Sequence, residues 1–350
     1  VEGFKEKDNG VEVLLKDNPS LQADMVVLAI GVTPDTALAK EAGLELGIKG
    51  SIVVNDRMET SVPDIYAAGD AVQVKHYVTG DDALISLAGP ANKQGRIIAD
   101  NICGGDSRYL GSQGSSVIKV FDITAATTGI NETNAKKSGL EVDTVILSPM
   151  SHAGYYPGGK VMTMKVVFEK DTYRLLGAQI IGYEGVDKRI DVLATAIHAG
   201  LKATQLKDLD LAYAPPYSSA KDPVNMAGFM IDNIAKGTLK QWHLEDMDKI
   251  SKDKSVVLLD VRTVGEFNRG HMDGFKNIPV DELRERINEI EKGKPVYLIC
   301  QSGLRSYIAS RILEGNGYET YNFSGGFRFY DVVVNDRVLI ERSYVCGMDY

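Results

Sequence analysis

Residues 295–306 have the sequence PVYLICQSGLRS. They predict a buried parallel strand that ends at Cys300, a loop that contains Gly303, and the start of a helix. Backbone N–H groups converge on an anion where a strand leads through such a loop into a helix. Arg305 adds a positive charge, so we expect Cys300 to be a catalytic nucleophile in its thiolate form. The alternative is a cysteine that is simply buried on its strand.

The loop from Cys300 to Arg305 resembles the active-site loop of rhodanese-type sulfurtransferases, in which four residues separate the two. Cysteine-dependent phosphatases have one residue more. The resemblance covers about the last hundred residues, and its further elements are Val256–Arg262, Glu266–Phe267, Gly270–Gly274, Asn277–Pro279 and Gly325–Phe327. It implies that Cys300 carries sulfane sulfur as a persulfide and that His271 lies on the active-site face. Phe275 departs from the pattern, because the family usually has a small residue there.

Composition limits the possible partners and compartments. The net charge of −9 argues against nucleic acid or an anionic membrane as a partner. The three cysteines, Cys103, Cys300 and Cys346, are odd in number and far apart. They indicate neither a disulfide framework nor a metal site, and we expect a reducing cytoplasm. No apolar run approaches the ~20 residues of a membrane helix; the longest, Met25–Val32, predicts a buried strand.

The N-terminal part is expected to come from a longer protein. It begins at Val1 without a methionine, and the alternation of Val11, Val13 and Leu15 predicts a small meander before the strand at Met25–Val32. Asp35 or Thr36 is the expected cap of the helix that follows. We expect four units, which are residues 1–48, 49–110, 111–238 and 239–350.

Residues 60–71, with the sequence TSVPDIYAAGDA, predict a short buried strand that ends in Gly69-Asp70. Glycine permits close approach of the backbone, and the carboxylate can accept hydrogen bonds from a sugar-like hydroxyl. The string is similar to the second flavin motif of flavoprotein disulfide reductases with two dinucleotide-binding folds. The resemblance implies that Asp70 holds the ribityl chain of FAD and that a helix over residues 94–101 faces the flavin. The implied cofactor-binding residues are Gly69, Asp70, Ala71, Leu87, Ala88 and Asn92.

Residues 117–237 predict an α+β unit. Strands are expected at 117–121, 142–147, 160–169 and 175–182, followed by an amphipathic helix with Val186, Ile190 and Leu193 on its apolar face. His198 on this helix is expected to be structural. The unit resembles the dimerisation domain of the same reductases.

Two tyrosine-rich strings narrow the resemblance to coenzyme A disulfide reductases. They are Ser151–Gly159 and Tyr213–Asn225, and in the second Pro215-Pro216 imposes an extended loop. The resemblance implies a homodimer in which Tyr155 and Tyr213 reach the partner's flavin and reactive cysteine, while Lys221 and Tyr155 bind coenzyme A. Tyr156 could replace Tyr155, and the tyrosines could instead only pack at an interface.

The sequence predicts an α/β protein, and the resemblances imply three parts: the C-terminal part of a two-dinucleotide-fold flavoprotein, an α+β dimerisation domain and an α/β rhodanese domain. The implied activity is FAD- and NAD(P)H-dependent reduction of coenzyme A disulfide, coenzyme A persulfide or polysulfide. The chain lacks a Gly-x-Gly-x-x-Gly fingerprint after a strand, and Cys103 is misplaced for the flavin-proximal cysteine. The chain alone is therefore not expected to complete the cycle. The alternatives are a relative of NADH oxidases or peroxidases, and a sulfur-binding or sensing module on a flavoprotein scaffold.

Overall fold

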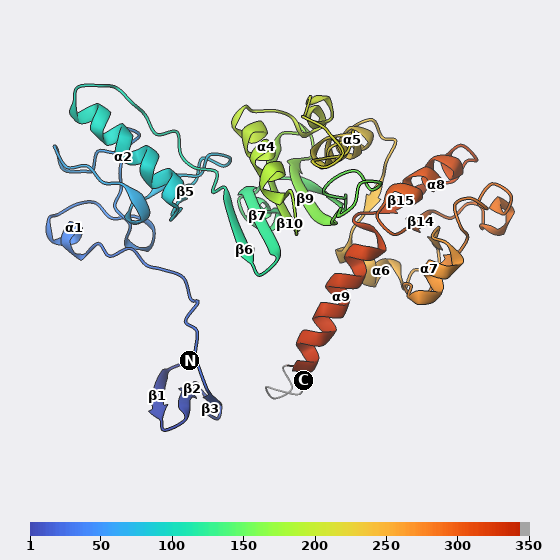
Figure 1. Cartoon of the computed structure of the whole chain (residues 1–350), viewed down its shortest axis with the longest axis horizontal. Coiled ribbons are helices and arrows are strands. Elements are labelled where there is room, and N and C mark those ends of the chain that lie inside the picture. The colour runs from blue at the N-terminus through green and yellow to red at the C-terminus, as the bar shows by residue number, and fades with distance from the viewer. Residues whose placement is uncertain (344–350) are drawn as a thin grey trace.

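The computed structural model describes residues 1–343, with side chains described to residue 334. At the N-terminus, three antiparallel strands form the predicted meander, β1 (Gly3–Lys7), β2 (Gly10–Leu14) and β3 (Leu21–Ala23). In Figure 1 this meander lies away from the rest of the chain, at the end of an extended connection.

The predicted buried strand at Met25–Val32 is wrong. The segment forms no strand, and its large apolar side chains other than Val26 are 66–89% exposed. A buried strand needs hydrogen-bonded neighbours, and no strand in the described part of the chain pairs with this segment. An apolar run in the sequence does not show whether neighbouring strands are present to pair with it.

Residues 37–112 form a small unit around Met58, Val72 and Val74. Its elements are α1 (Ala37–Glu41), the 3₁₀ turns η1 (Ile48–Gly50) and η2 (Gly69–Ala71), the short strands β4 (Val74–Lys75) and β5 (Asp82–Ala83), and α2 (Ala88–Ile102).

Three local predictions in this unit are corrected. The strand before Gly69 is absent, and only single bridges form there. Thr36 occupies the N-cap of α1, but its hydroxyl donates to the carbonyl of Gly50 instead of capping the helix. α2 begins at Ala88 instead of residue 94, because Pro90 falls in its first turn, where no backbone N–H is needed.

A five-stranded antiparallel sheet forms the centre of the chain, in the order β6-β7-β10-β9-β8. The strands are β6 (Ser116–Val120), β7 (Ile123–Gly129), β8 (Val142–Leu147), β9 (Met162–Glu169) and β10 (Leu175–Gly182). The sequence analysis missed β7, whose Ala and Thr residues lack a clear apolar alternation.

Helices cover one face of this sheet. α4 (Val186–His198) packs on β7 and β10, while α5 (Pro223–Ala235) packs on β8, on α4 and on the turn η3 (Ala203–Asp208). The short α3 (Glu132–Lys137) contacts β8. The predicted apolar face of α4 is confirmed, since Val186, Ile190 and Leu193 are at most 3% exposed.

The C-terminal part is a parallel sheet in the order β11-β15-β14-β12-β13. Its strands are β11 (Gln241–Trp242), β12 (Val257–Asp260), β13 (Lys276–Asn277), β14 (Val296–Ile299) and β15 (Thr320–Phe323). The helices and turns are η4 (Leu244–Asp246), α6 (Met247–Ile250), α7 (Val264–Arg269), η5 (Ile287–Glu289), α8 (Leu304–Glu314) and α9 (Gly326–Ser343). Phe275 is buried in one of the two cores of this part and stacks on Trp242.

The parallel sheet docks on the edge of the antiparallel sheet. The backbone N–H of Ile146 in β8 donates to Ser324 Oγ at 3.1 Å, and Gln241 Nε2 donates to the carbonyl of Thr144 at 3.2 Å. His243 Nε2 lies 3.3 Å from Asp143 Oδ1. The partner of His243 thus lies a hundred residues earlier in the chain, where no local pattern around His243 indicates it.

No helix among residues 1–343 has the length and apolarity that a membrane crossing requires. Within the same residues, no group of three or more His, Cys, Asp or Glu side chains could hold a metal ion.

Candidate functional sites

Cys300 lies directly after β14 and is 1% exposed. Its sulfur accepts a hydrogen bond from the backbone N–H of Gly303 at 3.1 Å and lies 3.2 Å from Ser306 Oγ, whose single proton is shared between the sulfur and the carbonyl of Gly303 at 3.1 Å. Gly303 has φ of 98°, a conformation that favours glycine, and is the N-cap of α8. Donors aimed at the sulfur stabilise its anionic form. The sequence analysis quoted Ser306 without assigning it this contact.

Arg305 forms a bidentate ion pair with Glu266, at 2.6 and 2.7 Å. The Arg305 guanidinium holds the pKa of Glu266 at about 2, and burial opposes this only in part. Glu266 also belongs to the capping box of α7 with Thr263. The positive charge of Arg305 is therefore shared with a carboxylate, and the direct donors to the sulfur are Gly303 and Ser306.

An arginine-rich cavity of about 380 Å³ adjoins the Cys300 loop. It is lined by Arg262, Glu266, Arg269, Gly270, Gln301, Phe327, Arg328 and Asp331. Arg262 is buried, pairs with Asp260 at 2.6 Å, and stacks over the ring of Phe327 at 3.9 Å. The Phe327 backbone N–H donates to the carbonyl of Cys300 at 2.8 Å, which joins the start of α9 to the loop. The arginine side chains that line this cavity suit the binding of an anionic sulfur donor.

His271 is exposed, and its ring stacks on Phe267 with 3.9 Å between centroids. Its Nδ1 lies 3.1 Å from the carbonyl of Phe267. These contacts bind the imidazole to α7.

Tyr155 and Tyr213 come together from two loops that are distant in sequence. Their hydroxyl oxygens lie 2.7 Å apart and share a hydrogen bond. This bond to Tyr155 raises the pKa of Tyr213 above its ordinary value. The side chains are 76% and 45% exposed. Tyr156 instead packs edge-to-face against His152, so the pair forms through Tyr155.

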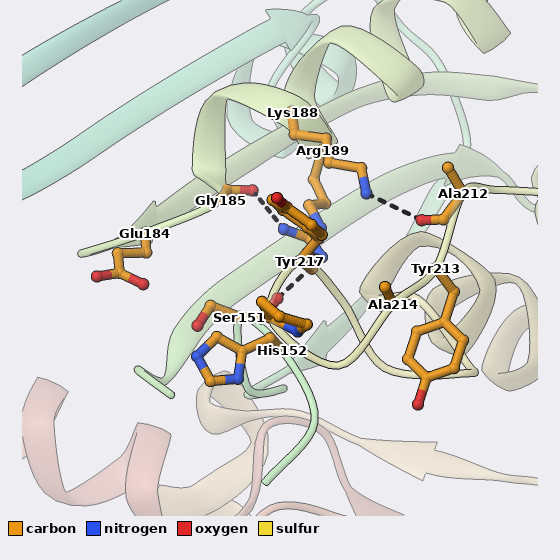
Figure 2. Close-up of a pocket in the computed structure, with 11 residues that line it drawn as sticks. Ser151, His152, Glu184, Gly185, Lys188, Arg189, Ala212, Tyr213, Ala214 and Tyr217 are labelled. Atoms are coloured by element: carbon orange, nitrogen blue, oxygen red, sulfur yellow. Dashed lines mark hydrogen bonds between the residues drawn. The ribbon is translucent and has the colours of Figure 1, made fainter. Parts of the chain in front are cut away.

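A cavity of about 550 Å³ lies beside Tyr213 (Figure 2). It is lined by Ser151, His152, Glu184, Gly185, Lys188, Arg189, Ala212, Tyr213, Ala214, Pro216 and Tyr217. In Figure 2 the Tyr213 ring points away from Arg189, while Lys188 reaches the carbonyl of Ala212. Lys221 follows on the same loop as Tyr213, is exposed, and places its ammonium 5.8 Å from the ring of Phe229.

The residues implied for flavin binding gather around η2 and the start of α2. Gly69 has φ of 85°, and its backbone N–H donates to Gln94 Oε1 at 2.7 Å, which joins η2 to α2. Asp70 is exposed and follows Gly69 directly. The N-cap of α2, Leu87, makes no side-chain capping bond, so Ala88 begins a helix without a side-chain cap. The exposed carboxylate can accept hydrogen bonds from hydroxyl groups. The free N–H groups at the nearby helix start can bind a phosphate.

Two other residues near α2 are placed differently. The Asn92 amide donates to the carbonyl of Ala88 within the helix at 2.9 Å. Cys103 is the C-cap of α2 and is exposed, at the end opposite to Ala88.

A thiol beside a backbone N–H and a serine hydroxyl, joined to an α+β unit that carries paired phenols, indicates thiol and sulfur chemistry. Residues 1–95 match the pyridine nucleotide-disulphide oxidoreductase family, and residues 115–223 match the dimerisation domain of that family. Residues 243–330 match the rhodanese-like domain. Two domains that match the pyridine nucleotide-disulphide oxidoreductases thus precede a rhodanese-like domain in this chain.

Solved structures and a curated relative agree with this assignment. The chain is 48% identical to the reduced CoADR-RHD of Bacillus anthracis, with a TM-score of 0.90 over 95% of this chain and 59% of that one. It is 41% identical to a NAD-dependent persulfide reductase from A. fulgidus, with a TM-score of 0.84 over 94% of this chain and 60% of that one. An NAD(P)H sulfur oxidoreductase (CoA-dependent) of Pyrococcus furiosus is 39% identical over 61% of this chain and 48% of its own length. The chain thus spans about half the length of the curated relative.

Proposed function

We propose that the complete protein reduces coenzyme A disulfide, coenzyme A persulfide or polysulfide, with FAD and NAD(P)H as cofactors. The observation that carries the proposal is the presence on one chain of the Cys300 loop and the hydrogen-bonded pair of Tyr155 and Tyr213. The proposed units are residues 1–48 and 49–110 for the nucleotide-binding parts, 111–238 for dimerisation and 239–350 for sulfur transfer. A reducing compartment such as the cytoplasm would keep the Cys300 thiol active.

The proposed role of Cys300 is to accept sulfane sulfur. Its thiolate attacks the outer sulfur of a persulfide donor, a new S–S bond forms at Cys300, and the donor leaves as a thiolate. No electrons are gained or lost overall in this exchange. The Gly303 N–H and Ser306 hydroxyl stabilise the attacking thiolate, and the arginine-rich cavity receives the anionic donor.

The proposed role of the tyrosine pair is to donate a hydrogen bond to a thiolate that leaves a coenzyme A disulfide or persulfide. Phenols suit this role because they donate without carrying charge at neutral pH. Exposure of both rings supports their use at the partner's site in a homodimer. Lys221, exposed on the same loop as Tyr213, would bind the anionic coenzyme A moiety.

The proposed cofactor site uses Gly69, Asp70 and Ala71 together with Leu87, Ala88 and Asn92 at the start of α2. FAD, when bound there, supplies the electrons that reduce the disulfide. Asp70 would accept hydrogen bonds from the ribityl hydroxyls, and the N–H groups of α2 would face negative charge. In the complete protein, Asp70→Ala should weaken FAD retention and leave sulfur loading of Cys300 unchanged. Equal loss of both would contradict separate sites.

Sulfur loading provides the direct test of the proposal. The chain is incubated with coenzyme A persulfide or with inorganic polysulfide, trapped with an alkylating agent, and examined by peptide mass spectrometry. In the parent chain we expect an added sulfur atom on the peptide that contains Cys300. The same peptide of Cys300→Ser should carry no added sulfur. Cys103→Ser is the matched control and should load normally, because Cys103 lies at the end of α2.

A separate measurement tests the reductase activity. The complete protein should oxidise NAD(P)H in the presence of coenzyme A disulfide or coenzyme A persulfide. Oxidation driven by oxygen or peroxide alone would support the oxidase or peroxidase alternative instead. Loading of Cys300 without any turnover would support a sulfur-binding module.

A further inference from the structure

A single buried guanidinium joins the two loops that carry the tyrosine pair. The first tyrosine loop, residues 148–161, connects β8 to β9 and carries Tyr155. The second tyrosine loop, residues 209–222, connects η3 to α5 and carries Tyr213. Neither loop contains a strand or helix. Arg189 on α4 is 1% exposed and contacts both loops.

The contacts of Arg189 use the whole width of its guanidinium. Nη2 donates to the backbone carbonyl of Ser151 in the first loop at 2.9 Å. The same nitrogen donates to Ser218 Oγ in the second loop at 3.1 Å and lies 3.0 Å from Asp222 Oδ2. Nη1 donates to the carbonyl of Gly185 at 3.2 Å. One rigid group thus spans both loops and the start of α4, and Figure 2 shows its contacts with Ser151 and Gly185.

The partners of Arg189 are themselves held in place. Ser218 and Asp222 are at most 3% exposed, and the Ser218 hydroxyl donates to Asp222 Oδ2 at 2.7 Å. Asp222 also caps α5 through the backbone N–H of Val224. The loops meet directly where the Ala153 N–H donates to the carbonyl of Ser218 at 2.9 Å. The buried ends of the loops are therefore rigid, whereas the tyrosine rings are exposed.

Glycine at position 185 is required by this arrangement. A Cβ atom added there would lie 2.1 Å from Arg189 Nη1, and the residue has φ of 71°. Lysine could not reproduce the full set of contacts. While Nη2 reaches both loops, Nη1 also donates to Gly185 and Nε to Asp222 at 3.2 Å, and one ammonium has only three donors at a single point.

We propose that Arg189 is the positioning residue of the tyrosine pair, and that its bridge between the two loops sets the contact of Tyr155 with Tyr213. Its catalytic significance rests on the function proposed above, but the bridge itself concerns only this chain. The simpler view is that Arg189 and Asp222 form a buried ion pair that contributes only to folding. The two views differ in what happens at the exposed hydroxyls.

The test observes the tyrosine hydroxyls directly in the full chain. Fluorinated tyrosine is incorporated, the resonances are assigned with Tyr155→Phe and Tyr213→Phe, and the phenols are titrated by NMR. Fluorination lowers the phenol pKa and keeps the titration within a range where the chain stays folded. In the parent chain Tyr213 should titrate above an ordinary labelled tyrosine, and Tyr155→Phe should remove this shift, because Tyr155 is its main cause.

Arg189→Lys should also remove most of the Tyr213 shift while the circular dichroism spectrum stays that of the parent. The matched control is Lys207→Met, which breaks an ion pair with Asp232 of 2.7 Å in the same unit and touches neither tyrosine loop. It should leave the shift intact. An unchanged Tyr213 shift in folded Arg189→Lys would overturn the proposal.

Ser218→Ala is the second variant, used if Arg189→Lys does not fold. It removes one arm of the bridge and keeps the charge pair, so a partial loss of the Tyr213 shift is expected. An intact shift in folded Ser218→Ala would then refute the bridge. Reductase activity of Tyr213→Phe in the complete protein is a separate readout. If that activity is normal, the proposed function of the tyrosines fails, and the titration still decides the role of Arg189.

Discussion

The Cys300 loop and the tyrosine pair differ in how their groups are brought together. Around Cys300, both donors to the sulfur lie within six residues of it, and the sulfur is buried. Tyr155 and Tyr213 are 58 residues apart, and both are exposed. The first site depends on local backbone geometry, which resists distant changes. The second depends on a buried bridge, so a change at Arg189 should reach hydroxyls that it does not touch.

The largest expected effect is the loss of one activity while the other is kept, because the Cys300 loop and the tyrosine pair act independently. In the complete protein, Tyr155→Phe combined with Tyr213→Phe should strongly reduce NAD(P)H-dependent reduction of coenzyme A disulfide and leave Cys300 loading unchanged. Cys300→Ser should abolish loading and leave coenzyme A disulfide reduction in place, because the donors to the sulfur include neither tyrosine. Steady-state assays and mass spectrometry measure the two. Parallel loss of both activities in either variant would show that the regions form one site.

A smaller effect is expected from one donor within the Cys300 loop. Ser306→Ala removes the hydroxyl that donates to the sulfur, and a hydrogen bond to a charged group contributes about 1.5–3 kcal/mol. We expect alkylation of Cys300 at neutral pH to slow by about tenfold or more. Ser310→Ala is the control, because that hydroxyl is also in α8 but donates to the carbonyl of Tyr307. Equal rates in both variants would exclude Ser306 as a stabilising donor.

The ion pair beside the loop should give a stability effect that depends on pH. The folded-state pKa of Glu266 is about 2, below its ordinary value of 4.5, chiefly because of Arg305. A depressed carboxyl pKa stabilises the fold above pH 4.5, and this stabilisation is lost as pH falls towards 2. The difference in Tm between the parent chain and Glu266→Gln should therefore shrink over that range.

Glu289→Gln provides the comparison for Glu266→Gln. Glu289 also has a pKa of about 2, owing chiefly to Arg286, but it lies at the surface. Solvent weakens exposed ion pairs, so this change should alter Tm less. A Glu266→Gln difference that grows as the pH falls would contradict the assigned role of Arg305.

The smallest expected effect concerns the contact between the two sheets. Burial is the largest influence and raises the pKa of Asp143, but the hydrogen bonds from His243 and the Thr144 backbone N–H, together with nearby positive charge, leave this pKa below its ordinary value. Asp143→Asn weakens this contact, which is one of several at the interface, so a loss of about 1 kcal/mol or less is expected. Faster protease cleavage within residues 237–241 would report the looser interface. An unchanged cleavage rate would show that the interface is held by other contacts, such as the hydrogen bond between Ile146 and Ser324.

Several features were predictable because they depend on neighbours in the sequence. The strand, loop and helix around Cys300 follow from residues 295–306, and the apolar face of α4 follows from its spacing. The helix at Ala88 was predicted six residues late, although proline is tolerated in the first turn of a helix, where Pro90 lies. Met25–Val32 was misjudged, because an apolar run indicates the need for neighbours and does not show whether they are present.

The sequence by itself determined the chemical groups of this protein: a thiol at the end of a strand, a carboxylate after Gly69, and tyrosines in proline-containing loops. The expected extended form of Pro215-Pro216 is corrected by the structure, because the Tyr217 N–H donates to the carbonyl of Ala214 and closes a turn there. Their local geometry follows from short-range sterics and backbone hydrogen bonding. Only the tertiary structure decided that Tyr155 pairs with Tyr213, that Glu266 shares the charge of Arg305, and that Arg189 bridges two loops. These contacts join residues that are 29 to 58 positions apart, and such pairings arise from packing of the whole chain, which local pattern does not encode.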